Sequence, residues 1–206
     1  WPVALLFPAV VPFGLGQVLE RVEGAMVDVL VDTPFLAWLP VREVELKPVV
    51  PWMEWVAGPL GLLIPFLLGF GIISAAGRRL VFMGFALAVG MATTALSAAL
   101  SYGPAHAWEW FGLPAQAGLV TALVLGALLL PVPPRSTAAL LVLALGVYLS
   151  LLNQMPTNPY FAQTLSAWEQ GRFIRFHGIA QWLGWVWPYA ALAYVMRRIL
   201  VREPKN

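Results

Sequence analysis

The chain has 206 residues, of which 60% are hydrophobic and only 11% are charged, whereas about 25% of the residues of an ordinary soluble domain are charged. This deficit argues against a water-soluble globule, and the mean hydropathy of +0.79 agrees. Cysteine is absent, which excludes disulfides, Cys-ligated zinc, covalent c-type haem and a thiol nucleophile. The net charge of +2 comes with no nucleic-acid-binding motif, so we expect no nucleic acid partner.

Six apolar stretches are long enough to predict membrane-spanning helices, each of which needs about 20 residues. They predict an all-α polytopic membrane protein with a single transmembrane helical domain. The first stretch contains Pro2, Pro8 and Pro12, and we expect a kinked helix or the end of one there. Because the chain opens with Trp1 inside that stretch, we also expect that an N-terminal part of the full protein is missing. The six stretches are residues 2–19, 54–76, 80–102, 115–132, 136–154 and 178–200.

The distribution of charge orients these helices, because Lys and Arg near span ends are retained on the cytoplasmic side. One set of alternating segments carries seven basic residues and one acidic residue, and the other set carries five basic and nine acidic residues. We expect the first set, which includes Arg78, Arg79, Arg135, Arg197 and Arg198, to be cytoplasmic together with the C-terminus. The long connections are then external. In this arrangement no Asp, Glu, Lys or Arg lies at mid-membrane depth, unlike in proton pumps and voltage sensors.

The first long external segment, residues 20–53, is expected to begin as a helix and to continue as a strand or extended segment. The alternation over residues 41–47 indicates the extended part. The helical pattern consists of the apolar residues Val18, Val22, Met26, Val29 and Leu30.

The external segment after the fifth apolar stretch is expected to hold an amphipathic helix. Asn158 and Pro159 are typical of a helix start. Phe161, Leu165 and Trp168 then fall on one helical face. This pattern predicts a helix that lies in the outer membrane interface.

Arg172 and Arg175 are the candidate ligand-binding cations of the same segment. On one helical turn they could hold a lipid phosphate or a substrate pyrophosphate through forked hydrogen bonds. Alternatively, they extend to the headgroup layer beside Phe173 and Phe176. Their external position favours a functional role, because positive charge there opposes the topological bias. Glu169 could simply neutralise one of them.

The two histidines, His106 and His177, both fall at external span ends. A buried bis-histidine haem is therefore not expected. A metal site would require both histidines to converge with Glu109 and Glu169, and no metal-binding spacing supports this. We expect no metal, no cofactor and no catalytic residue. Trp182 is interpreted as part of an interfacial aromatic belt.

Two further features of the apolar stretches concern how the helices pack. Trp187 and Tyr189 lie deeper in the last stretch, where they either pack between helices or line a groove for an acyl chain. A small-residue stripe that allows close helix packing runs along the third stretch. It consists of Gly90, Thr94, Ser97 and Ser101. The candidate ligand-binding residues are thus Arg172, Arg175, His177, Trp168, Glu169, His106 and Trp182.

Several strings resemble the C-terminal half of the long VanZ-like membrane proteins of proteobacteria. They are residues 94–108 (TALSAALSYGPAHAW), 158–165 (NPYFAQTL), 168–178 (WEQGRFIRFHG) and 181–189 (QWLGWVWPY). The resemblance implies a multi-pass protein of the bacterial inner membrane with long periplasmic loops. It also implies a link to glycopeptide resistance, especially teicoplanin resistance, and to envelope processes, without an established reaction.

Three functions are therefore weighed. The leading hypothesis is an envelope protein that binds a lipid, a lipid-linked glycan or a lipoglycopeptide at the outer leaflet without catalysis. The first alternative is an accessory or assembly subunit of a larger membrane complex, with a membrane protein as partner. The second is a lipid-modifying enzyme that uses His106, Glu109 or His177.

Overall fold

The structure is a computed structural model that describes residues 1–7, 11–38, 51–155 and 174–200; for a few of these residues, including 174–177, it describes only the backbone. Within these ranges all regular structure is helical, with six α-helices and three short 3-10 helices. The all-α expectation is confirmed. The segments expected to hold the extended stretch at 41–47 and the amphipathic helix after Asn158 lie outside the described residues.

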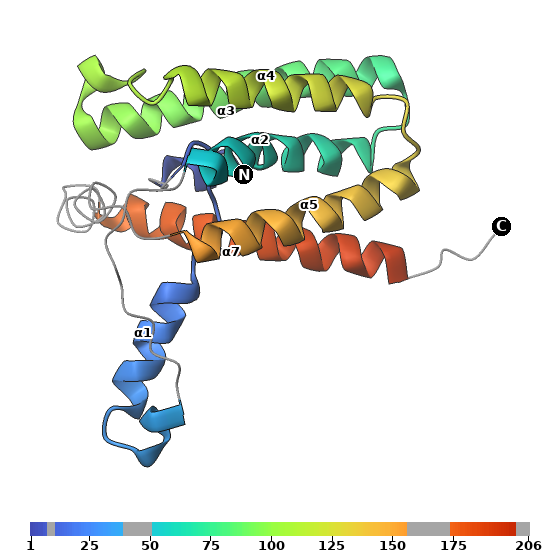
Figure 1. Cartoon of the computed structure of the whole chain (residues 1–206). Helices are drawn as coiled ribbons and strands as arrows, with labels where there is room; N and C mark the ends of the chain where they lie inside the picture. Colours follow the sequence, from blue (N-terminus) through green and yellow to red (C-terminus); the bar gives the residue numbers. More distant parts are fainter. Residues whose placement is uncertain (8–10, 39–50, 156–173, 201–206) are drawn as a thin grey trace.

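Five helices run alternately up and down in a bundle (Figure 1). α2 is the central helix and packs against α3, α4 and α5. By length and composition, α3 and α5 could each cross a membrane, while α2 and α4 contribute shorter apolar helices. The bundle consists of α2 (Pro51–Phe70), α3 (Ala76–Tyr102), α4 (Leu113–Leu128), α5 (Pro134–Gln154) and α7 (Ile174–Leu200). These bounds match the last five expected stretches to within six residues.

The core of the bundle lies around α2. Phe66 and Phe70 are fully buried there, and Leu145 and Leu152 of α5 belong to the same buried cluster. α4 approaches closely because Gly126 has no side chain, so that its Cβ position is only 2.8 Å from the Met83 sulfur. Close packing of this kind requires a small residue at the contact.

The expected helix over residues 2–19 is not formed in the described part of that range, which corrects the prediction. Only η1 (Ala4–Leu6), a short 3-10 helix, is present, and residues 11–18 are irregular. Positive φ angles of 64° at Phe13 and 98° at Gly16 redirect the chain. Most of the described apolar side chains of this stretch are instead buried, namely Ala4, Leu5, Leu6, Phe7, Val11, Phe13 and Leu15. Irregular backbone is tolerated even at membrane depth where it is buried in protein.

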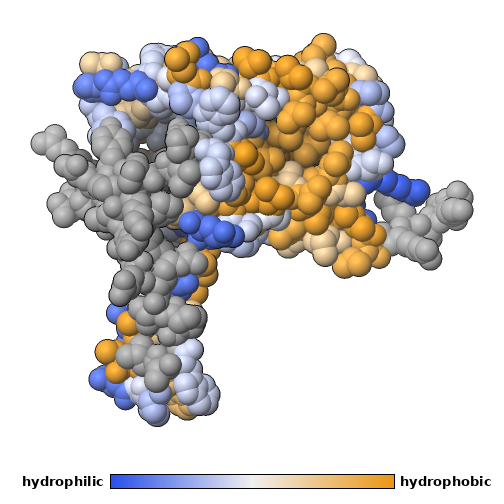
Figure 2. Space-filling view, viewed as in Figure 1, coloured by the Kyte–Doolittle hydropathy of each residue, from blue (hydrophilic) through white to orange (hydrophobic). Residues whose placement is uncertain are grey.

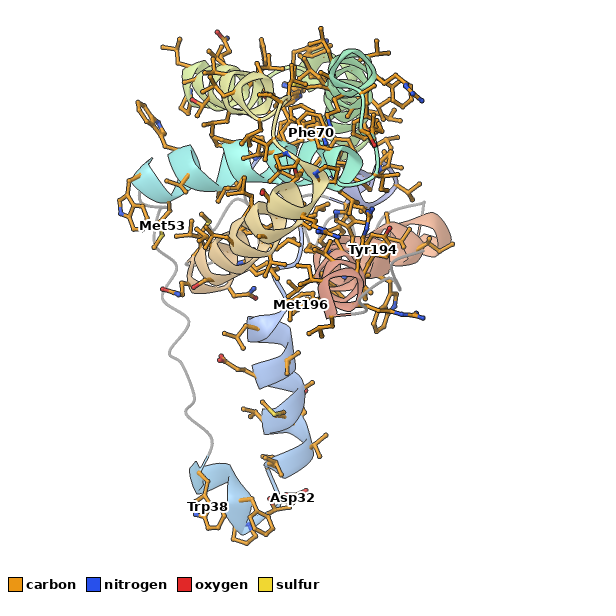
Figure 3. All side chains as sticks on the ribbon, turned by 90° about the vertical axis from the view of Figure 1, so that its right-hand side faces the viewer. Asp32, Trp38, Met53, Phe70, Tyr194 and Met196 are labelled. Atoms are coloured by element: carbon orange, nitrogen blue, oxygen red, sulfur yellow. The ribbon has the colours of Figure 1, made fainter. Side chains whose placement is uncertain are left out.

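α1 (Leu19–Leu30) and the 3-10 helix η2 (Pro34–Trp38) project from the bundle as an arm. The helical pattern expected from Val18 onward is thus confirmed. Figure 1 shows the axis of α1 running across the direction of the bundle helices. In Figure 3, Asp32 and Trp38 lie at the far end of this arm, away from the bundle that contains Phe70.

The two ends of the bundle differ in chemistry. We call the end with the α2–α3 and α4–α5 connections and the C-terminus of α7 the basic end, because it carries Arg78, Arg79, Arg135, Arg197 and Arg198. The opposite end holds the start of α2, the α3–α4 connection and the first half of α7. We call it the aromatic end, because it carries Trp52, Trp55, Trp108, Trp110, Trp182 and Trp185.

Candidate functional site

The structure brings together His106 and Glu109 at the aromatic end. His106 closes the short 3-10 helix η3 (Pro104–His106) in the connection between α3 and α4. Its Nδ1 lies 2.6 Å from Glu109 Oε1, a hydrogen bond that the carboxylate accepts. The side chains are 47% and 64% exposed. The pair is therefore open to a ligand at the surface and is not a buried structural contact.

Aromatic contacts fix the connection that carries this pair. The ring of Trp110 stacks with that of Trp108 at 6.2 Å and meets the ring of Phe13 edge-on at 5.9 Å. The Trp110 indole also donates to the carbonyl oxygen of Ala107 at 3.0 Å. Because Phe13 belongs to the irregular N-terminal segment, this segment supports the position of the His106–Glu109 pair.

Trp182 lies near the start of α7 and is 64% exposed. Its ring meets that of Trp185 edge-on at 5.5 Å. Trp185 in turn meets Phe7 at 6.3 Å, so one indole faces outward and the next packs against the chain. The expected place of Trp182 in an interfacial aromatic belt stays a prediction.

The other candidate residues are only partly described. The backbone of Arg175 and His177 belongs to the first two turns of α7, which begins earlier than the expected stretch at residue 178. Their side chains lie outside the described part of the structure. Trp168, Glu169 and Arg172 also lie outside it. The Arg172/Arg175 pair therefore stays a prediction.

A set of polar side chains that the sequence patterns did not indicate holds the irregular segment. The Tyr148 hydroxyl donates to the carbonyl oxygen of Phe13 and accepts from the amide of Leu15, both at 2.6 Å. Tyr148 is buried in α5. The signal that could have revealed it is a Tyr within an apolar helix, since a buried hydroxyl requires a partner.

Asn153 makes the contact that fixes the start of the arm. Its Oδ1 accepts hydrogen bonds from the amides of Val18 and Leu19, at 3.0 and 2.9 Å. α1 starts after Val18, which provides no side-chain cap, so α5 supplies the cap from a distant part of the chain. The Asn153 amide and the Tyr189 hydroxyl both donate to the carbonyl oxygen of Gly16 at 3.2 Å. We call Asn153 and Tyr189 the anchor.

At the basic end, Arg79 is almost completely buried, with 1% of its surface exposed. Its guanidinium donates to the carbonyl oxygens of Phe70, Ile73, Leu130 and Val132 at 2.6–2.8 Å. These carbonyls belong to the ends of α2 and α4 and the turns that follow them, where helix carbonyls lack intrahelical partners. Arg79 is therefore a shared C-terminal cap, whereas its neighbour Arg78 is exposed.

In the described ranges, no three His, Asp or Glu side chains converge as a metal centre would require. Comparisons with protein-family models, with curated proteins and with solved structures find no match to this chain. Its function must therefore be inferred from geometry and residue chemistry.

Proposed function

We propose that this chain is a multi-span protein of the bacterial inner membrane. The observation that carries the proposal is the exposed apolar side of the bundle, which is broad in Figure 2. In the most apolar 18-residue stretch of α3 only 28% is buried, and in that of α5 only 39% is buried. The core helix of a soluble protein is mostly buried. Large apolar residues exposed on the bundle helices include Val81, Phe85, Leu96, Val120, Val124, Leu128, Val186 and Leu200.

The difference between the two ends supports an orientation. Arginine is retained on the cytoplasmic side of a membrane, and tryptophan gathers at the interfaces. With the basic end inside, the His106–Glu109 pair, the arm and the start of α7 are all external.

Within that orientation, we propose that the aromatic end binds a lipid, a lipid-linked glycan or a lipoglycopeptide without catalysing a reaction. The exposed His106–Glu109 pair and Trp182 offer hydrogen-bonding and aromatic groups at headgroup level. Arg172 and Arg175, close to the start of α7, supply cations suited to a phosphate. The resemblance to VanZ-like proteins supports a role in the cell envelope.

The packing of the small-residue stripe favours this proposal over an accessory subunit. Gly90 lies directly against Trp1, whose ring is 2.7 Å from the Gly90 Cβ position. Ser97 donates to the carbonyl oxygen of Leu6 at 2.9 Å. Part of the stripe is thus used by the chain's own N-terminal segment, which reduces the surface it could offer to a partner helix.

The membrane location is tested by cysteine labelling, because the native chain has no cysteine. Arg78→Cys marks the basic end and Ala105→Cys marks the aromatic end. With an impermeant maleimide on intact cells, we expect labelling of Ala105→Cys at once and of Arg78→Cys only after permeabilisation. The reverse pattern would show the orientation to be wrong, and recovery of the protein in the soluble fraction would refute the membrane location.

The binding proposal is tested with the pair Arg172→Gln/Arg175→Gln in bilayers of defined anionic lipid. Each charge near the surface contributes on the order of 1 kcal/mol. At low salt the Gln pair should therefore bind the bilayer more weakly than the native protein does, and at high salt the difference between the two should be smaller. The matched control is the double Lys variant, which keeps the charge but lacks the fork and should recover only part of the binding. Unchanged binding by a folded Gln pair would remove the phosphate site.

Native mass spectrometry separates the leading function from the subunit alternative. Retained lipid is expected on the detergent-purified protein, whereas a stoichiometric protein partner would support the alternative. A lipid-modifying activity that is lost on replacing His106 or His177 would instead support an enzyme.

A further inference from the structure

The arm, residues 19–38, is the part of the described structure that the bundle does not cover. It leaves at the aromatic end and runs across the bundle axis (Figures 1 and 3). If the bundle helices cross a bilayer, an element in this direction runs parallel to the bilayer plane. The orientation alone therefore distinguishes the arm from a domain that extends into the aqueous phase.

One face of α1 is apolar and exposed. Leu19, Val22, Met26 and Val29 recur at intervals of three and four residues, so they share a helical face. All four are exposed, and Val29 is 76% exposed. Asp28 is exposed on the opposite side of the helix.

The far end of the arm is aromatic. Phe35 and Trp38 are 54% and 81% exposed, and their rings meet edge-on at 5.6 Å. Exposed Trp and Phe beside an amphipathic helix are typical of segments that lie at a membrane surface. Asp32 lies at the same end (Figure 3). Acidic and aromatic side chains therefore occur together at the far end of the arm, as acidic and apolar side chains do on α1.

The direction of the arm is held by the anchor. Asn153 caps the first amides of α1, and both Asn153 and Tyr189 donate to the carbonyl oxygen of Gly16. These contacts come from α5 and α7, so the orientation of α1 is tied to the bundle. Because these contacts hold α1 beside the aromatic end, the apolar face of α1 is in the same surroundings, lipid or water, as the aromatic end.

We infer that the arm is an interfacial membrane helix of the outer leaflet, with its apolar face in the boundary between headgroups and acyl chains. This inference rests on the proposed function, which places the aromatic end outside. Lipid is the occupant that fits, because the same plane passes through the aromatic end and along α1. The acidic side, with Asp28 and Asp32, faces water, and it favours zwitterionic over anionic headgroups.

The test uses three single-cysteine variants that carry an environment-sensitive fluorophore: Val29→Cys on the apolar face, Asp28→Cys on the polar face and Val124→Cys on the apolar side of α4. The protein is reconstituted in phosphatidylethanolamine/phosphatidylcholine vesicles. Quenching is measured with spin-labelled lipid and with aqueous iodide. We expect lipid quenching at Val29 and Val124 and iodide quenching at Asp28.

The Val124 label keeps the two proposals apart. Lipid quenching at Val124 together with iodide quenching at Val29 would overturn the interfacial arm but leave the membrane bundle standing. Absence of lipid quenching at Val124 would refute the membrane bundle itself. A Val29 label protected from both quenchers would show that protein, such as a second copy of the chain, covers the face, and this too would overturn the inference.

Two further measurements sharpen the inference. Asn153→Ala removes the cap, and we expect lipid quenching at Val29 to fall at least twofold while quenching at Val124 is unchanged. Unchanged quenching at Val29 would refute the role of the anchor. Replacing half of the lipid with phosphatidylglycerol should reduce quenching at Val29, and an increase would contradict the preference for zwitterionic headgroups.

Discussion

Arg79 donates a hydrogen bond to the carbonyl oxygen of Phe70 at 2.7 Å, and its guanidinium lies 5.4 Å from the centre of the Phe70 ring. The same guanidinium reaches the turn after α4 through Leu130 and Val132. A positive charge is favourable beside the C-terminal carbonyls of helices, which carry partial negative charge. Arg79 therefore joins the ends of two helices that are distant in sequence.

Replacing Arg79 with Gln is expected to destabilise the bundle strongly. Several buried carbonyls would lose their donor, which costs about 3 kcal/mol or more and corresponds to a fall in Tm of roughly 6–12 °C for a chain of this size. Arg78→Gln is the matched control and should change Tm little, because Arg78 is exposed. Thermal unfolding in detergent compares the two. Equal Tm values for both variants would contradict the shared cap.

Tyr148→Phe is expected to loosen the irregular N-terminal segment. The change leaves the Leu15 amide and the Phe13 carbonyl without their partner, at a cost of about 1–3 kcal/mol. Tyr194→Phe, at an exposed position of α7, serves as the control. Limited proteolysis between residues 11 and 18, together with Tm, reads out the effect. Unaltered protection in Tyr148→Phe would show that the hydroxyl is dispensable.

Two glycines of α2 provide a test of close packing. A Cβ at Gly61 would lie 2.6 Å from the carbonyl oxygen of Phe13, whereas a Cβ at Gly58 would meet nothing within 4 Å. We expect Gly61→Ala to destabilise by about 1–3 kcal/mol, because the backbone of the segment must shift. Gly58→Ala should be neutral or stabilising, since Ala favours helix over Gly by about 1 kcal/mol. Equal stability of the two variants would argue against this contact.

The His106–Glu109 pair is expected to matter little for stability. Exposed ion pairs contribute about 0–1 kcal/mol, so Glu109→Gln should leave Tm almost unchanged. Ligand retention, measured by native mass spectrometry on the same variant, should fall if the pair touches the bound molecule. A large loss of Tm would indicate a structural role for the pair instead.

Hydropathy was sufficient to locate the five bundle helices, because each of them coincides with an apolar stretch that is long enough to form a helix. It failed in the described part of residues 2–19, where most of the apolar side chains are buried without forming a long helix. The three prolines in that stretch were the available warning. Apolar runs therefore indicate burial more securely than they indicate the form of the backbone.

The polar contacts were much less predictable than the helices. Arg78 and Arg79 are adjacent in sequence and were assigned one role, although one is exposed and the other caps two helices. Asn153 gave no distinctive pattern, because its partners at Val18 and Leu19 lie more than 130 residues away. By contrast, the proximity of His106 and Glu109 follows from their local spacing, which is why this part of the site could be anticipated.

The cap that Asn153 places on α1 couples movements of α5 to movements of the arm. α1 has 12 residues, which correspond to a length of about 18 Å. Because α1 is fixed to α5 at its base, a tilt of α5 by about 10° displaces the far end of α1 by roughly 3 Å for that length. A small tilt of α5 is thus converted into a larger displacement of the far end of the arm, where Trp38 lies.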